Sequence, residues 1–322
     1  MRPQPWAWRW TRNGLVAGMA GWGLWKVPAS KLWIASHSFK PGWVAGALLF
    51  SSIMLVVRCA KWHLLLSESQ FTSGRREAAR SLLGSYALGT ISPGRLGDFA
   101  RFAFVEEAMR GRVLLATFLD KAFDIWAVLS FAALSLFWLA PRPVALSVAA
   151  LWLALLPLFG RFPAALQRFR RFPARRRNLL DQVSRASEML RTVCARRYGL
   201  WALAAGAADL LTLFCLLHAL RPVHPFVALA TYPWLVIAGA FPISVGGLGP
   251  REVVSAMILP RFFVPVESAI SISLLFYLLT VLLPAILGGV WYLARYLARP
   301  KAQAASVVPI AAEPAPATVG SG

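Results

Sequence analysis

Long apolar runs follow one another along most of this chain and predict a bundle of membrane-spanning helices. A helix crosses the hydrocarbon core with about 20 mostly apolar residues, and backbone polar groups inside a membrane must be paired within the segment. The predicted spans are 14–25, 42–57, 113–140, 143–160, 200–220 and 267–294. The first of these runs also has the outline of a signal peptide, but we interpret it as an uncleaved span because a second apolar run follows at once.

Two further apolar segments are interrupted by glycine and proline. In residues 82–104 the break runs from Ser92 to Asp98, and in residues 231–259 it runs from Phe241 to Glu252. Each break has the spacing Pro-x-x-x-Gly with an arginine four or five residues later, namely Pro93, Gly97, Arg101 and Pro242, Gly246, Arg251. Paired interruptions in two halves of opposite orientation are typical of inverted-repeat transporters. We therefore expect an all-α polytopic membrane protein of about six to eight segments, two of them re-entrant or broken.

The residues after each break suit an anion. A helix can restart at each point, with Asp98 as an N-cap in the first break and Pro250 in the first turn after Gly249 in the second. Free N–H groups and the positive end of the helix dipole then lie beside Arg101 or Arg251, which can fork onto phosphate oxygens. The alternative is that glycine and proline only let helices pack closely, with the arginines at the membrane interface.

Charged residues also occur inside or beside the predicted spans. Arg58 and Lys61 follow the span 42–57, where their long stems can reach the interface. Asp120 and Asp124 share one face of the next span, and Lys121 can reach Asp124. Asp209 stands alone in its span and needs a partner from another helix. These acids either neutralise an unoccupied arginine or relay protons, or they form a fixed ion-pair cluster, and the sequence leaves both alternatives open.

Composition and charge place these spans in a membrane and orient them. The 322 residues are 58% hydrophobic and 15% charged, with a net charge of +21, which we attribute to loops on anionic lipid rather than to nucleic acid binding. Residues 161–197 hold eleven arginines and two acids. We therefore expect this loop and both termini on the cytoplasmic side of a bacterial-type cytoplasmic membrane.

The predicted domains are a membrane domain at 1–299, which includes a basic loop at 161–198, and a disordered tail at 300–322. Helically spaced apolar residues in the loop predict an amphipathic helix on the inner leaflet, or a solvated connector.

The chain carries few residues suited to catalysis. Cys59, Cys194 and Cys215 are odd in number and widely spaced, and the four histidines are scattered. The sequence contains no His-Glu-x-x-His and no Gly-x-Ser-x-Gly motif. We therefore expect no metal site, no cofactor and no enzyme activity.

Four motifs carry a resemblance to a known family. They are Arg58 to Trp62 (RCAKW), Ser92 to Arg101 (SPGRLGDFAR), Asp120 to Asp124 (DKAFD) and Phe241 to Glu252 (FPISVGGLGPRE). In these motifs, and over most of residues 14–298, the sequence resembles the flippase-like integral membrane family that includes the membrane domain of lysylphosphatidylglycerol synthase. The resemblance implies a helical domain that moves a phospholipid or polyprenyl-phosphate headgroup between leaflets, and it points to Arg95, Asp98, Arg101, Asp120, Arg251 and Glu252.

Pattern and resemblance together give one expected substrate-binding set. It comprises Arg95, Asp98, Arg101, Asp120, Lys121, Asp124, Ser244, Gly246, Gly247, Gly249, Arg251 and Glu252. Lys121 and Pro250 depart from the family pattern, and no soluble aminoacyl-transfer domain follows residue 300, so synthesis of lysyl-lipid is not expected. We expect translocation of an anionic lipid, with a possible homo-oligomer or lipid-synthesis partner. The alternatives are an intramembrane enzyme and a scaffold for lipid or glycan modification.

Overall fold

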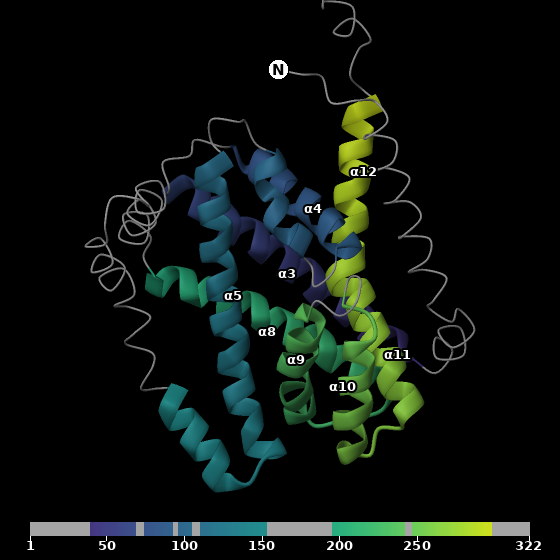
Figure 1. The fold of residues 1–322 in the computed structure, drawn as a ribbon. Coiled ribbons are helices and arrows are strands. Elements are labelled where there is room, and N and C mark those ends of the chain that lie inside the picture. Colours follow the sequence, from purple (N-terminus) through teal and green to yellow (C-terminus); the bar gives the residue numbers. More distant parts are fainter. Residues whose placement is uncertain are drawn as a thin grey trace, which may run out of the picture.

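The computed structural model of the protein describes residues 39–68, 74–92, 96–104, 110–152, 195–241 and 247–297 (Figure 1). Every regular element in these ranges is helical, which confirms the all-α prediction. The elements are α3 (Pro41–Glu68), α4 (Arg75–Ile91), η1 (Leu96–Phe104), α5 (Arg110–Leu139), α8 (Ala195–Leu220), α9 (Pro225–Ala240), α10 (Pro250–Ile258), η5 (Leu259–Phe262), α11 (Val266–Tyr277), η6 (Leu278–Leu282) and α12 (Leu283–Leu297). The predicted span 14–25, most of the basic loop 161–198 and the tail 300–322 lie outside the described residues.

Four helices in the described ranges are long and apolar enough to cross a membrane. They are Pro41–Ser67, Val113–Leu139, Arg196–Leu220 and Val266–Trp291, and two shorter apolar helices, Arg142–Trp152 and Pro225–Ala240, accompany them. A tight turn follows α5, since the Val144 N–H donates to the Pro141 carbonyl at 3.0 Å where the helix Arg142–Trp152 begins. The chain is a multi-pass membrane protein.

Helix α3 is longer than the apolar run that predicted it. The sequence placed its end near residue 57, but the helix continues to Glu68. Trp62, Leu65 and Leu66 are buried in the apolar core formed with α4 and α5, so packing extends the helix beyond the point where charged residues begin. The prediction that Arg58 and Lys61 mark the end of the helix is therefore wrong, and both lie within it.

The described elements form two halves with the same order. In each half a long helix (α3 or α8) precedes a shorter helix (α4 or α9), a break, a short helix (η1 or α10) and a long helical stretch (α5 or α11–α12). The first helices of the two halves pack together, while α4 packs against α12 and α9 packs against α5. In Figure 1, α5 descends through the view and α11–α12 ascends, which is the arrangement that an inverted repeat predicts.

The last span is continuous through a π-helical turn, η6, between α11 and α12. Such a turn releases a backbone carbonyl from the regular ladder. The hydroxyl of Ser51, in α3, donates to the carbonyl of Leu279 at 2.7 Å. This hydrogen bond ties the first half to the last helix near the middle of the molecule.

Candidate functional site

The first break is a corner in which the two helix ends touch through glycines. A Cβ added to Gly97 would lie 2.2 Å from the carbonyl oxygen of Leu88, and one added to Gly89 would lie 2.0 Å from Oδ1 of Asp98. The Ser92 hydroxyl accepts from the Gly97 N–H at 2.6 Å. Only hydrogen atoms fit at the two glycines, so these contacts explain why the sequence has glycine there. Asp98 was predicted as the N-cap, but it lies in the first turn of η1, which already begins at Leu96.

The second break is built in the same way. A Cβ on Gly247 would lie 2.6 Å from the carbonyl oxygen of Gly239, and a Cβ on Gly239 would lie 2.0 Å from Nε of Arg251. Gly249, with φ of 103°, caps α10, and its N–H donates to the Glu252 carboxylate at 2.5 Å. The prediction that the helix restarts at Pro250 is confirmed.

These contacts give the register between the two halves. Gly89 and Gly97 are eight residues apart, as are Gly239 and Gly247, and one arginine follows four residues after each pair. The sequence spacing had matched Gly97 with Gly246. The glycine that makes the equivalent close contact is Gly247, so the two halves are related by a single offset of 150 residues.

The arginine after the first break is enclosed by protein. Arg101 is 3% exposed, and its guanidinium lies 4.4 Å from the ring centroid of Trp62. Its Nη1 forms an ion pair with Oδ2 of Asp120 at 2.7 Å. The Trp62 indole is itself held by a hydrogen bond to Ser81 at 2.8 Å. In this arrangement Arg101 is neutralised from within the protein.

Asp120 is the centre of a buried charge network. Besides Arg101, it pairs with Nζ of Lys61 at 2.8 Å and accepts the hydroxyl of Tyr198 at 2.8 Å. Lys61 also pairs with Asp124 and is only 1% exposed. The predicted reach of Lys61 to the membrane interface is therefore wrong. Its ammonium group points into the bundle because α5 presents both carboxylates to it, which confirms that Asp120 and Asp124 share a face.

Two further ion pairs join helices that are distant in sequence. Lys121 pairs with Asp98 at 2.9 Å and so connects α5 to η1. The sequence had predicted that Lys121 contacts Asp124 instead. Arg58 pairs with Asp209 at 2.7 Å and donates to the Tyr86 hydroxyl at 2.6 Å. The expected partner of Asp209 from another helix is thus Arg58, in α3.

The network is electrically balanced among these residues. Its cations are Arg58, Lys61, Arg101 and Lys121, and its anions are Asp98, Asp120, Asp124 and Asp209. Buried charges are tolerated when each has a partner of opposite sign. The geometry fits both alternatives for these acids, because they form a paired cluster and Asp120 also neutralises Arg101. Arg58 and Lys61 were expected at the membrane interface and were given no partner, although charged residues inside an apolar helix need one.

Arg251 has different surroundings from Arg101. It is also 3% exposed, but it packs against the backbone of Gly239 and lies 5.4 Å from the ring centroid of Tyr277. The residues of the second half at the same offset as Asp120 and Asp124 are Ile270 and Leu274. The carboxylates of Asp120 and Asp124 consequently have no counterpart at these positions of the second half, where the second break has an aromatic ring and a helix N-terminus instead.

Three residues of the expected site, Arg95, Ser244 and Gly246, lie outside the described residues. Of the remainder, Asp98, Arg101, Asp120, Lys121 and Asp124 are brought together, while Gly247, Gly249, Arg251 and Glu252 form the second break. Within the part of the chain that the structure describes, no group of three His, Cys, Asp or Glu side chains is placed to hold a metal ion.

Comparison with known families agrees with this architecture. The profile of the lysylphosphatidylglycerol synthase TM region matches residues 10–288, which is most of the chain and includes both breaks. The chain belongs to this family. No curated protein shows significant similarity to it. This member of the family thus has its two glycine-sealed corners and its buried charge network inside the region that the family profile matches.

Proposed function

We propose that this protein moves an anionic lipid, either a phospholipid or a polyprenyl-phosphate-linked lipid, between the leaflets of the cytoplasmic membrane. One observation carries the proposal. Two broken helices in oppositely directed halves each bury an arginine four residues after the glycine that seals the break. Broken helices at membrane depth are tolerated where protein or a wet cavity covers them, and in transporters they hold the substrate.

The groups around the breaks have the chemistry that a phosphate requires. An arginine donates two parallel hydrogen bonds to phosphate oxygens, and Arg251 lies in the first turn of α10, at the positive end of that helix. Near the first break, Lys61, Arg101 and Tyr198 all bind the carboxylate of Asp120. The same donors suit a phosphate, so an arriving headgroup would replace Asp120 as their partner.

The packing of the halves supports a route for alternating access. Each shorter helix rests on the long helix of the opposite half, α4 on α12 and α9 on α5. A shift of one helix against its partner would uncover a break toward one leaflet while the other break stays closed. This would expose the arginines to each side in turn, as inverted repeats do in transporters.

Lipid exchange in reconstituted vesicles tests the proposal. Vesicles would contain either a labelled anionic or a labelled zwitterionic phospholipid, and loss of label from the inner leaflet would be followed. We expect the protein to accelerate exchange of the anionic lipid. Arg251→Gln should slow that exchange about tenfold or more, because one charge-assisted phosphate contact is removed. Arg261→Gln, which changes an exposed arginine just beyond α10, is the matched control and should retain the wild-type rate.

Two other results would refute translocation. Chemically altered lipid without leaflet exchange would identify an intramembrane enzyme. Neither exchange nor alteration by a protein with the wild-type melting temperature would favour a scaffold for a lipid- or glycan-modifying partner. The melting temperature is measured for each variant, so that loss of folding is not taken for loss of transport.

A further inference from the structure

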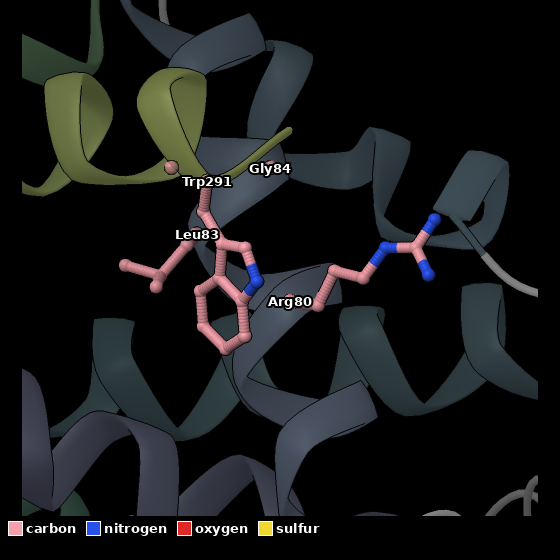
Figure 2. A pocket seen from close by; sticks show the side chains of 5 residues that line it. Arg80, Leu83, Gly84 and Trp291 are labelled. Atoms are coloured by element: carbon pink, nitrogen blue, oxygen red, sulfur yellow. The ribbon is translucent and has the colours of Figure 1, made fainter. Parts of the chain in front are cut away.

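We propose that a cleft between α4 and α12 binds the phosphate of an anionic phospholipid from the leaflet next to the basic loops. This inference goes beyond translocation, because none of the residues that line the cleft belongs to either break. The cleft is small and partly open, and it is lined by Arg80, Leu83, Gly84, Gly288 and Trp291. The same side chains are seen from close by in Figure 2.

Small residues shape the cleft. A Cβ on Gly288 would lie 2.2 Å from the carbonyl oxygen of Leu83, so α12 and α4 approach each other backbone to backbone at this point. Gly84 follows Leu83 in α4 and packs against the ring of Phe104, since a Cβ added to Gly84 would lie 2.6 Å from that ring. The cleft opens beside this crossing. Arg80 lies one turn before Leu83 in α4, and Trp291 lies one turn after Gly288 in α12.

The polar side chains that line the cleft are both donors. An arginine guanidinium and an indole N–H donate hydrogen bonds and accept none. Nε of Arg80 is buried and has no hydrogen-bond partner within the described residues. Figure 2 shows the indole edge that carries the nitrogen turned toward the stem of Arg80, while the guanidinium extends outward. A ligand that fits here must bring acceptors and negative charge, as a phosphodiester does.

The surroundings identify a membrane lipid as the source of the phosphate. Arg75 and Arg76 are exposed at the start of α4, and α12 continues past Trp291 to Arg295. Tryptophan together with arginine at the ends of apolar helices is typical of the headgroup region, where anionic lipid is abundant. Leu83 and the two glycines make the rest of the lining small and apolar.

Lipid binding to the intact protein in detergent tests this site. Native mass spectrometry would give the apparent Kd of the first bound phosphatidylglycerol and of the first bound phosphatidylcholine. We expect tighter binding of phosphatidylglycerol. Arg80→Gln should weaken it about fivefold or more, as expected for loss of one charge-assisted contact, and Trp291→Phe should weaken it less, because it removes only the indole N–H. Arg76→Gln, the same change at an exposed position of the same helix, should have no effect.

Several results would overturn the site. The first is equal affinity for the two lipids, and the second is an equal effect of Arg80→Gln and Arg76→Gln on binding. The third is displacement of phosphatidylglycerol by inorganic phosphate at matched concentration, which would indicate a site for a small free anion. Binding is measured at equilibrium without leaflet exchange, so its failure is distinguishable from failure of translocation. In the vesicle assay Arg80→Gln should keep its exchange rate, and loss of exchange would show that the cleft belongs to the transport route.

Discussion

At the scale of single residues, the protein depends on charges that neutralise each other in an apolar setting. Each intramembrane charge costs at least about 2.5 kcal/mol by insertion scales, and Asp120 offsets this cost by binding Lys61, Arg101 and Tyr198. Removing one partner of a buried pair leaves the other uncompensated, which costs about 3–5 kcal/mol. A substitution at Arg101 should therefore affect both stability and transport, and the two effects must be separated by experiment.

A double substitution separates the two roles of Arg101. Arg101→Gln alone should lower the free energy of unfolding by about 3 kcal/mol, because Asp120 loses one of its two ion pairs and the network keeps one carboxylate in excess. Adding Asp120→Asn removes the excess charge and should restore part of that stability, while anionic lipid exchange stays slow in both variants because the guanidinium is absent. Melting temperatures in detergent and exchange rates in vesicles give the two readouts. Exchange that recovers together with stability would assign Arg101 a structural role only.

At the scale of elements, each break works because a glycine lets the restarted helix lie directly on the preceding one. The two glycines of a break meet different kinds of atoms. Gly97 and Gly247 each meet a backbone carbonyl, which cannot move aside, whereas Gly239 meets the flexible side chain of Arg251. A methyl group at Gly239 would therefore displace the guanidinium and leave the corner in place.

Gly239→Ala tests this arrangement. We expect anionic lipid exchange to fall to the level of Arg251→Gln, with a change in unfolding free energy of no more than about 1 kcal/mol. Gly289→Ala is the control, because an added Cβ there meets nothing within 4 Å, and it should leave exchange unchanged. If Gly239→Ala exchanges lipid at the wild-type rate, the packed position of Arg251 does not matter for transport.

At the scale of the whole molecule, the two halves run in opposite directions and exchange their packing partners. The helices α4 and α9 each rest on the other half, so neither half is complete alone. From the positive-inside rule we expect the basic loops of the pair in the cytoplasm. The start of α4 and the turn after α10 should lie on opposite sides of the membrane.

Thiol labelling in cells tests that orientation. In a background without Cys59, Cys194 and Cys215, we expect Arg261→Cys to react with a membrane-impermeant reagent from outside and Arg75→Cys to react only after lysis. Both positions are exposed, so accessibility on a given side depends on topology alone. Labelling of both from the same side would contradict the inverted arrangement in the membrane.

Local patterns were sufficient to predict the four long spans that the structure describes, the two breaks and the start of α10 at Pro250. Apolar length, glycine and proline act within one or two turns, so these features need no knowledge of the fold. The sequence also indicated the two arginines, Arg101 and Arg251, since each follows its break at close spacing.

Tertiary structure alone decided which charges meet. Lys61 and Asp120 are 59 residues apart and Arg58 and Asp209 are 151 apart, so their pairing depends on how α3, α5 and α8 cross. It also decided that Gly247 matches Gly97, because only the contact with the preceding helix distinguishes it from Gly246. Side chains reach only a few ångströms, and their partners are therefore set by helix packing rather than by position along the chain.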